Sequence, residues 1–462
     1  MQELNTDDFA DTALLPADSE LTATPLQIVR SGTFDDFING LTSSDQQWLK
    51  RQSFAGKTGQ VAWLENGQGV IGSDSEDSLT TLGHLPFQLP EGVYRLTGEA
   101  SFIALLGWGL GGYRFDRYKQ TDRLPAQLVL PHGADAVELV HTIKATNLAR
   151  DLINTPAQDM APSHLQAEVV ALAEAFDAEV NTTVGDELLD LECGAIHAVG
   201  RAAADGPRLM DLTWGNPDHP KITIVGKGVT FDSGGLNLKP SGGMRWMKKD
   251  MGGAAIAMGL GYLVMSQALP VRLRLLIPAA ENAVAGNAFR PGDVLHTHKG
   301  LTVEIDNTDA EGRLLLCDAL SMASSEKPEL IIDYATLTGA ARGAVGAEIG
   351  AMFSNDDSLA QQLQLLGKTE DDAVWPMPLH DAYDYMLKSN IADLVNSAAS
   401  PYAGAVTAAL FLKRFIDEVP WLHFDVMAFN IRKRPGRPEG GEAMGLRSVY
   451  RYLAQRFGAS DE

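Results

Sequence analysis

Short apolar runs alternate with helical stretches along the second half of the chain. The runs typical of strands are 222–225, 271–277, 301–305 and 330–334, and the second of them is expected to end before Pro278. The stretches typical of helices are 253–268 and 313–325. This alternation predicts an α/β sheet with helices on both faces. In such a sheet the ligand site lies at the carboxyl ends of the strands.

The N-terminal part has a different pattern, in which short apolar runs are separated by polar loops. We predict a small α/β domain over 1–130. Helical periodicity follows at 134–149 and 165–176, on either side of a break that holds two prolines, so 131–170 is predicted to be a linking helical segment. A larger C-terminal domain, with a central mixed sheet flanked by helices, is expected over 171–462.

Composition narrows the classes of protein that fit these 462 residues. Lys and Arg number 37 against 60 Asp and Glu, a net charge of −23, which argues against nucleic acid or an anionic membrane as a partner. Two cysteines, Cys193 and Cys317, are too few for a disulfide framework or a thiolate zinc site. The start lacks a secretory signal, and the apolar stretch at 252–265 is too short to span a bilayer. We therefore expect a cytoplasmic location.

Charged residues cluster at or near the loops where the predicted strands end. The carboxylates are Asp232, Asp250, Asp309 and Glu311, and the interleaved cations are Lys227, Lys239 and Arg313. One interpretation is a set of solvated loop charges and helix caps. The other is a metal site, because divalent cations prefer such oxygen ligands and four carboxylates would balance two of them. Both interpretations remain open on spacing alone.

Competing motifs are weak or missing in this sequence. There is no HExxH or GxSxG motif, and His296 and His298 are only two residues apart. The stretch 56–58 matches the end of a P-loop, but Arg51 occupies the position of its first glycine. The GxGxxG pattern at 107–112 matches a dinucleotide-binding loop, yet no apolar helix start follows it. Nucleotide binding is therefore a weak alternative.

Four blocks of sequence carry a resemblance to a known family. They are VGKGVTFDSGGLNLKP at 225–240, MKKDMGGAA at 247–255, NTDAEGRL at 307–314 and DYATLTGA at 333–340. In content, order and spacing they resemble the leucine aminopeptidase (cytosol aminopeptidase) family. The resemblance covers roughly 140–450, and the N-terminal 130 residues resemble the family only loosely. Asn237 and Cys317 depart from the commonest pattern, and neither is at a matched ligand position.

The resemblance implies a metallo-exopeptidase that holds two divalent ions, zinc or manganese, and works as a homohexamer on peptide substrates. The matched metal ligands are Asp232 and Glu311, which bridge both ions, Lys227 and Asp250 at the tighter site, and Asp309 at the exchangeable site. Lys239 matches the lysine that polarises the scissile carbonyl, and Arg313 matches the arginine that holds bicarbonate. The matched substrate-pocket residues are Met247, Asn307, Thr336, Leu337, Gly339 and Met444.

The implied reaction is hydrolysis of the N-terminal peptide bond, with a preference for apolar first residues such as leucine. A hydroxide shared by two cations would attack, and bicarbonate would serve as the general base. Lys227 must bind metal as a neutral amine, so its pKa must fall far below the usual ~10.4. The alternative is a binding or regulatory protein that has kept the fold.

Overall fold

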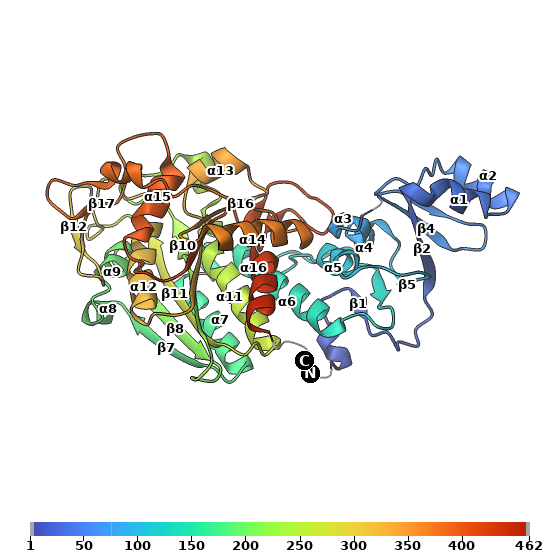
Figure 1. Ribbon diagram of the computed structural model, residues 1–462, viewed down its shortest axis with the longest axis horizontal. Helices are drawn as coiled ribbons and strands as arrows, with labels where there is room; N and C mark the ends of the chain where they lie inside the picture. The colour runs from blue at the N-terminus through green and yellow to red at the C-terminus, as the bar shows by residue number, and fades with distance from the viewer. Residues whose placement is uncertain (1–3, 75, 459–462) are drawn as a thin grey trace. The chain divides into compact units, whose positions relative to one another are not determined.

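A computed structural model describes residues 4–74 and 76–458 of the chain. It divides into two compact units. The first unit holds Met1–Asn147 and Ile431–Glu439, and the second holds Leu148–Asn430 and Gly440–Glu462. Helix α6 (Ala136–Asn154) runs across the division (Figure 1).

The first unit is built on a six-stranded sheet of order β1-β6-β5-β2-β4-β3. Its strands are β1 (Leu14–Leu15), β2 (Thr24–Arg30), β3 (Val61–Trp63), β4 (Gly69–Ser73), β5 (Val93–Leu96) and β6 (Gln127–Val129). Its helices include α1 (Phe34–Asn39), α2 (Ser43–Arg51), α3 (Leu79–Leu82), α4 (Leu85–Gln88) and α5 (Phe102–Gly111). All pairings are parallel except that of β3 with β4. The buried α5, with Trp108 at its centre, fills the core on one face.

The second unit is built on a mixed sheet of order β16-β15-β18-β14-β9-β11-β8-β7, with β10 paired to β11. Its strands are β7 (Glu179–Val184), β8 (Arg208–Trp214), β9 (Lys221–Gly226), β10 (Gly228–Asp232), β11 (Arg272–Asn282), β14 (Leu330–Ala335), β15 (Gly350–Ser354), β16 (Val374–Pro376) and β18 (Trp421–Asp425). The central strands β11, β9, β14 and β18 run parallel, which directs their carboxyl ends to one edge. Two further small sheets pair β12 (Val294–His296), β13 (Thr302–Glu304) and β17 (Leu394–Val395), and β19 (Phe429–Asn430) with β20 (Gly440–Gly441).

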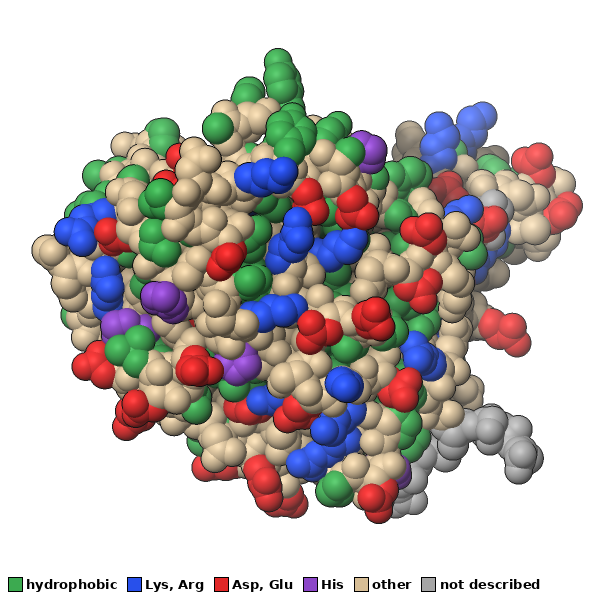
Figure 2. All heavy atoms as spheres, turned by 60° about the vertical axis from the view of Figure 1, so that its left-hand side comes forward, with side chains coloured by type: hydrophobic (Ala, Val, Ile, Leu, Met, Phe, Trp, Pro, Cys, Tyr) green, Lys and Arg blue, Asp and Glu red, His purple; other side chains and the backbone are tan. Residues whose placement is uncertain are grey.

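Helices cover both faces of this sheet (Figure 1). One face carries α9 (Gly194–Gly200), α12 (Gly312–Ser325) and α15 (Gly404–Lys413), which share a large apolar core with the strands. The other carries α7 (Pro162–Ala175), α11 (Gly252–Ser266), α14 (Asp357–Thr369) and α16 (Leu446–Phe457). Within the described residues, no helix combines the length and the apolar character that a bilayer span requires. Figure 2 shows Asp and Glu side chains spread over one face, with Lys and Arg between them.

The predicted fold class, a small N-terminal α/β domain and a larger domain with a mixed sheet between helices, is confirmed. One predicted strand end is wrong, because β11 continues through Pro278 to Asn282. The reason lies in the neighbouring strands. On one side β11 pairs with β9 up to Leu276 and with β10 from Ala279 onward. Pro278 falls between these two ladders, where a missing N–H is tolerated.

Glycines bring α11 close to the strands beneath it. A side chain at Gly226 of β9 would lie 2.5 Å from Ala254 Cα, and one at Gly253 would lie 2.1 Å from the Tyr334 carbonyl oxygen. Neither neighbour is a flexible side chain, so neither contact can relax without moving backbone. The Gly- and Ala-rich start of α11 therefore fixes how closely the helix approaches the carboxyl ends of β9 and β14.

We predict that Gly253→Ala lowers the free energy of unfolding by about 1–3 kcal/mol or more, because the added methyl group overpacks a backbone contact. Gly261→Ala in the same helix is the matched control. Its methyl group would meet only Leu275 Cδ2 at 3.4 Å and Leu273 Cδ2 at 3.9 Å, and alanine is the better helix former by about 1 kcal/mol. Thermal unfolding midpoints measure both effects, and equal midpoints for the two variants would contradict this account of the packing.

Candidate active site

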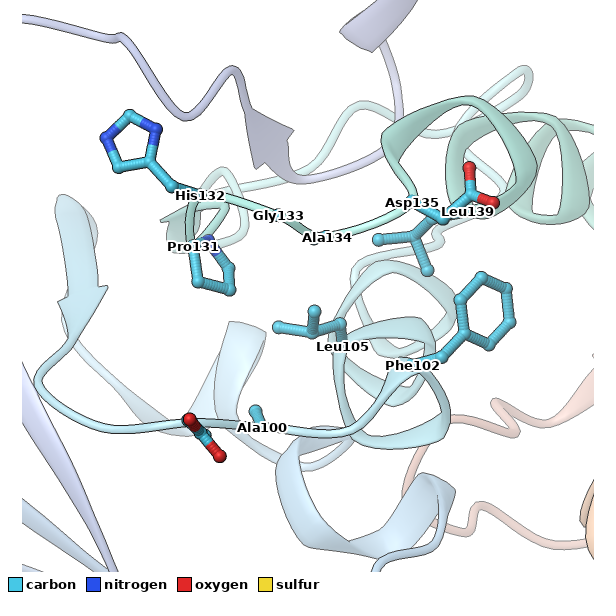
Figure 3. Close-up of a pocket in the computed structure, with 10 residues that line it drawn as sticks. Ala100, Phe102, Leu105, Pro131, His132, Gly133, Ala134, Asp135 and Leu139 are labelled. Atoms are coloured by element: carbon cyan, nitrogen blue, oxygen red, sulfur yellow. The ribbon is translucent and has the colours of Figure 1, made fainter.

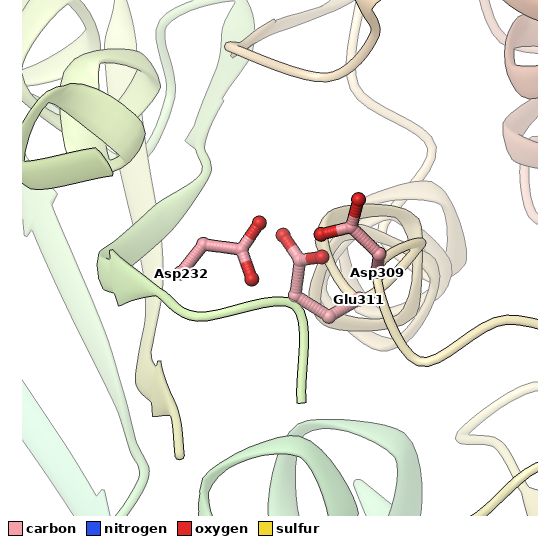
Figure 4. Close-up of side chains that lie close together, drawn as sticks. All are labelled: Asp232, Asp309 and Glu311. Carbon is pink, nitrogen blue, oxygen red and sulfur yellow. The ribbon is translucent and has the colours of Figure 1, made fainter. Parts of the chain in front are cut away.

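Three of the predicted carboxylates converge at one edge of the central sheet. Asp232 ends β10, and Asp309 and Glu311 precede α12, where Glu311 is the N-cap residue. One oxygen from each lies within 4.8 Å of the others, and Figure 4 shows the three groups pointing toward one another. Asp232 and Glu311 are buried, and Asp309 is half-buried. Such a convergence of like charges is the geometry of a cation site.

Lys227 joins Asp250 to this cluster. It lies between β9 and β10, and its Nζ is 2.7 Å from Asp250 Oδ2 and 2.9 Å from Glu311 Oε1. The same ammonium donates to the Thr336 carbonyl oxygen at 3.2 Å. Thr336 in turn donates from its hydroxyl to Asp250 Oδ1 at 2.8 Å. The structure thus brings together four residues from separate sequence blocks.

Lys239 bridges the other side of the cluster. Its Nζ lies 2.7 Å from Asp232 Oδ2 and 2.5 Å from Asp309 Oδ1. The side chain of Lys239 is 16% exposed, against 2% for that of Lys227. Lys239 is therefore the cation of the pair that a molecule entering from solvent can reach.

Glycines clear the space that these side chains need. Gly234 and Gly235 have φ of +88° and +61°, and a side chain at Gly234 would lie 3.0 Å from Asp309 Oδ1. Gly312, the first residue of α12, would place a Cβ 2.5 Å from Lys227 Cε. Only a residue without a side chain lets Lys227 pass the start of this helix.

A polar network that the sequence did not reveal ties the two ligand loops together. Asn282 at the end of β11 donates to Asp232 Oδ1 at 2.8 Å and to the Thr308 carbonyl at 3.0 Å. The Thr308 hydroxyl donates to the Gly234 carbonyl at 2.7 Å, and the Asn237 side chain accepts from the Thr308 backbone N–H at 2.9 Å. Asn237, an unusual residue against the family pattern, thus fixes the loop before Asp309. Its position inside a matched block was the available signal, whereas nothing in the sequence pointed to Asn282.

The electrostatics of the cluster are unfavourable without added positive charge. Burial, and then the charge of Asp232, raise the pKa of Glu311 and that of Asp309. Burial also raises the pKa of Asp250, but Lys227 and Lys249 outweigh it and bring this pKa below its ordinary value. Lys227 and Lys239, the two lysines in close contact with the four carboxylates, balance two of their charges, and Lys249 lies farther away, at 3.9 Å from Asp250. The donor set therefore fits divalent cations, which would relieve the remaining repulsion.

Lys227 is an ammonium in this arrangement. Burial lowers its pKa, but the charges of Asp250, Glu311 and Asp232 outweigh burial and raise the pKa above its ordinary value. It can act as a metal ligand only as a neutral amine, so a cation must take the place of its proton. Neighbouring metal cations would lower the pKa of Lys227 instead of raising it, because they favour the uncharged amine.

Arg313 lies in the first turn of α12 and has donors to spare. Its Nη1 donates to the Asn396 carbonyl at 2.7 Å, while its buried Nε finds no partner within the described residues. Burial lowers the pKa of Arg313 to about 10, against the charges of Glu311 and Asp425. Asn396, which sequence reasoning missed, also accepts from the Asn307 backbone N–H at 3.2 Å. A buried guanidinium with an unused N–H fits a small oxyanion.

The predicted pocket residues lie on four segments, one of which holds Asn307, between β13 and α12. Met247 is on the 3₁₀ turn Met247–Met251, Thr336, Leu337 and Gly339 lead from β14 into α13 (Gly339–Val345), and Met444 lies between β20 and α16. Asp425 fixes the second segment, because its Oδ1 accepts from the Leu337 and Thr338 backbone N–H groups, each at 3.0 Å. The Asn307 side chain accepts from the Asp309 backbone N–H at 2.9 Å. The placement of Met444 beside these residues stays a prediction.

Two cations stand close in the chain to predicted pocket residues, Lys249 after Met247 and Arg342 after Gly339. Lys249 is only 1% exposed, and burial lowers its pKa to about 8. Asp250 acts against that shift, and Arg342 adds to it. Arg342 in α13 reaches back so that its Nη2 lies 3.6 Å from the position of a Cβ on Gly339. Lys249 stands inside a matched block, so its charge was visible in the sequence, but its burial was not.

A separate cavity of about 370 Å³ lies wholly within the first unit (Figure 3). Phe102, Leu105 and Leu139 line it, with Glu99 and Asp135 among its polar residues. None of the predicted site residues contributes to it. The convergence of charged groups points instead to the edge of the second unit's sheet.

Comparison of the sequence with known proteins gives matches to both units. Residues 147–450 match the model described as the cytosol aminopeptidase family, catalytic domain, and residues 24–131 match the M17 aminopeptidase, N-terminal domain. A probable cytosol aminopeptidase of Roseiflexus castenholzii is 38% identical over 384 residues, 79% of this chain and 77% of that protein. A probable cytosol aminopeptidase of a Geobacter species is 40% identical over 375 residues, 78% of this chain and 76% of the relative.

Solved structures agree with these matches. The cytosol aminopeptidase from Coxiella burnetii superposes with a TM-score of 0.92 at 45% identity, covering 96% of this chain and 99% of that one. The bottromycin maturation enzyme BotP in complex with Mn gives a TM-score of 0.84 at 32% identity, covering 94% and 100%. The sequence blocks, the two-unit fold and these similarities lead to one conclusion: the chain belongs to the cytosol aminopeptidase family, a family of metal-dependent peptidases.

Proposed function

We propose that this chain is an aminopeptidase that uses two divalent ions to remove apolar N-terminal residues, such as leucine, from peptides. The observation that carries the proposal is the buried cluster of four carboxylates held by two lysines. A binding protein that had merely kept the fold would have no need to maintain so much unbalanced buried charge. The free α-amine of the substrate fits beside Asp250, which would restrict cleavage to the first residue.

Five residues would hold the ions in this proposal. Asp232 and Glu311 would bridge them, Lys227 and Asp250 would complete one site, and Asp309 would complete the other. When bound, two such ions supply Lewis acidity and lower the pKa of water from about 15.7 toward about 7. The BotP structure contains Mn, which supports manganese alongside zinc as a candidate.

We predict that dialysis against a chelator abolishes release of p-nitroaniline from leucine p-nitroanilide, and that zinc or manganese restores it. Elemental analysis of the reloaded protein should approach two ions per chain. Saturation at one ion would contradict the two-ion site, and full activity without metal would overturn the proposed function. Ion binding without any amine release would favour the binding-protein alternative.

We predict that Asn282→Ala weakens binding of the metal held by Asp232 by about 10–100-fold, the usual cost of losing a group that orients a ligand. Asn282 donates to Asp232 Oδ1, and alanine leaves the Gly234 backbone N–H as the remaining hydrogen-bond donor to that oxygen among the described residues. Asn287→Ala is the matched control, since its amide donates to the Arg201 carbonyl instead. Metal titrations of both variants measure the effect, and equal affinities would exclude this role for Asn282.

Lys239 is proposed to stabilise the oxyanion that forms at the scissile carbonyl. Burial lowers its pKa, but Asp232 and the other carboxylates outweigh burial and raise it above its ordinary value. Without added ions the side chain is therefore an ammonium at neutral pH. A preorganised charge at the position where negative charge develops accelerates the reaction without reorganisation.

We predict that Lys239→Ala lowers kcat by roughly 10²–10³-fold, the usual cost of removing one oxyanion donor. Its metal content should not fall, because the variant removes a competing cation from Asp232 and Asp309. Steady-state kinetics and elemental analysis of the same preparation test both statements. Normal kcat at normal metal content would show that Lys239 takes no part in the reaction.

Arg313 is proposed to hold bicarbonate. Its unused Nε donor supports this role, as does its place in the first turn of the helix that Glu311 caps. A bound bicarbonate can accept a proton and return it to the leaving amine, which the cluster's carboxylates cannot do while they bind metal. The alternative role for Arg313 is to neutralise Glu311.

We predict that bicarbonate, titrated into carbonate-depleted buffer, activates the wild type several-fold. Arg313→Ala should respond hardly at all, because it lacks the two-point anion contact. Initial rates with leucine p-nitroanilide provide the measurement. An equal response in both proteins, or no response in the wild type, would leave Arg313 with the neutralising role.

Three further expectations belong to this proposal. Met247 and Met444 would give the pocket an adaptable apolar wall for leucine and methionine, with Thr336, Leu337, Gly339 and Asn307 around it. The chain would assemble as a homohexamer, by resemblance alone, and sedimentation equilibrium that gave a monomer would refute this. A cytoplasmic location is supported by Cys193 and Cys317, which are free and buried.

A further inference from the structure

Asn396 lies where two segments of the chain leave the same small sheet side by side. β13 and β17 run parallel, and Glu304 is paired with Val395. The loop 306–310, which carries Asp309, follows β13, and Asn396 is the first residue after β17. The backbone N–H of Asn396 donates to the Glu304 carbonyl at 2.9 Å and so continues the pairing. Its side chain therefore starts beside the 306–310 loop.

The side-chain amide of Asn396 is 0% exposed and is fully engaged with this loop. Its Oδ1 accepts from the backbone N–H groups of Asp306 and Asn307, at 2.9 and 3.2 Å. Its Nδ2 donates to the carbonyl oxygens of Asn307 and Ala310, at 2.7 and 3.3 Å. Because an amide offers two acceptor and two donor positions, the backbone of the 306–310 loop occupies every one of them.

These four contacts fix the backbone on both sides of Asp309. Ala310 follows Asp309 directly, and the side chain of Asn307 accepts from the Asp309 N–H at 2.9 Å. Residues 305–311, all of them described, form neither helix nor strand, so the course of this loop depends on such contacts. Without the amide of Asn396, repulsion between Asp309 and the neighbouring carboxylates would be opposed only by the contacts of Thr308 on the other side of the loop.

The main chain of Asn396 holds the guanidinium of Arg313 at the same time. The Asn396 carbonyl oxygen accepts from Arg313 Nη1 at 2.7 Å. Arg313 Cζ lies 5.9 Å from the centre of the Phe411 ring, and Phe411 belongs to α15, the next helix after Asn396 in the chain. One carbonyl and one ring therefore place the guanidinium, while its buried Nε has no partner among the described residues.

We propose that Asn396 is a positioning residue that couples the ion held by Asp309 to the anion held by Arg313. This inference rests on the proposed function, which assigns those two ligands to Asp309 and Arg313. The amide of Asn396 sets the position of Asp309, and the carbonyl of the same residue sets the position of Arg313. A single residue thus fixes the spacing of the two groups, and it acts on the reaction only through the side chains that it places.

A residue that only stabilised the fold would behave differently when it is replaced. The unfolding temperature would fall, but the folded molecules would keep their affinities for metal and bicarbonate. Loss of a positioning residue changes both affinities in the folded molecules. We expect the weaker of the two ion affinities to fall by about 10–100-fold, the usual cost of losing a group that orients a ligand. The bicarbonate concentration that gives half-maximal activation should rise several-fold.

Two variants of Asn396 test this role. Asn396→Ala removes all four side-chain contacts and leaves two buried N–H groups without their acceptor, which is costly to stability. Asn396→Asp has nearly the same shape and keeps the acceptor for the Asp306 and Asn307 N–H groups, so it guards against loss of folding. It loses both donors. Its added negative charge favours cations, so weaker ion binding by this variant must come from displacement of the loop.

Asn355→Ala is the matched control. Asn355 also joins two distant backbone groups, because its amide donates to the Val419 carbonyl and accepts from the Trp421 N–H, each at 2.8 Å. Trp421 is the first residue of β18, at the amino end of that strand and away from the carboxylate cluster. This variant should lose stability but keep the wild-type affinities for metal and bicarbonate.

Three measurements are made on each protein. Calorimetric titration of the metal-free protein with zinc or manganese gives the ion affinities. Initial rates with leucine p-nitroanilide at saturating metal give the bicarbonate response. Hydrogen exchange of the metal-free protein, followed by mass spectrometry, reports local opening of the segment 305–311. Both Asn396 variants should show weaker ion binding, a weaker bicarbonate response and faster exchange of this segment than the wild type and Asn355→Ala.

The outcomes separate this inference from the function on which it rests. Wild-type ion affinities in Asn396→Asp overturn the inference, and so does exchange of 305–311 in the wild type as fast as in an unstructured peptide. If bicarbonate does not activate the wild type, the role proposed for Arg313 fails, and the ion titration decides whether Asn396 positions Asp309. If the wild type binds no ion, the proposed function fails, and equal exchange of this segment in wild type and Asn396→Asp overturns the positioning role.

Discussion

Repulsion among four carboxylates at one edge of the central sheet is the constraint on which the second unit depends. Burial strengthens this repulsion, because the effective dielectric is lower than in water. Lys227 and Lys239 each contact two of the carboxylates and offset half of the charge. The negative charge that remains makes the cluster a cation site. The repulsion between these carboxylates also explains why the surrounding loops are held by so many hydrogen bonds.

The backbone around the cluster is shaped to hold these side chains in place. Gly312 leaves room for the stem of Lys227, and Gly234 turns the chain where any Cβ would meet the Asn237 carbonyl at 2.5 Å. Thr308 then joins the loop after β10 to the loop before α12 through both its backbone and its hydroxyl. Because the two loops are fixed to each other, Asp232 and Asp309 cannot separate to relieve their repulsion.

The charged residues singled out in the sequence come together in the structure, because they stand in short blocks at or near the ends of predicted strands. Their roles as metal ligands stay a prediction. The sequence could not predict contacts set by pairing between distant strands. Pro278 looked like a strand end, since only the register of β9 and β10 shows that no ladder partner is lost there. The strand order of the first unit likewise depends on pairing between strands that are distant in the sequence, so it could not be predicted. Asn282 and Asn396 were missed because their roles depend on which residues distant in the sequence they reach.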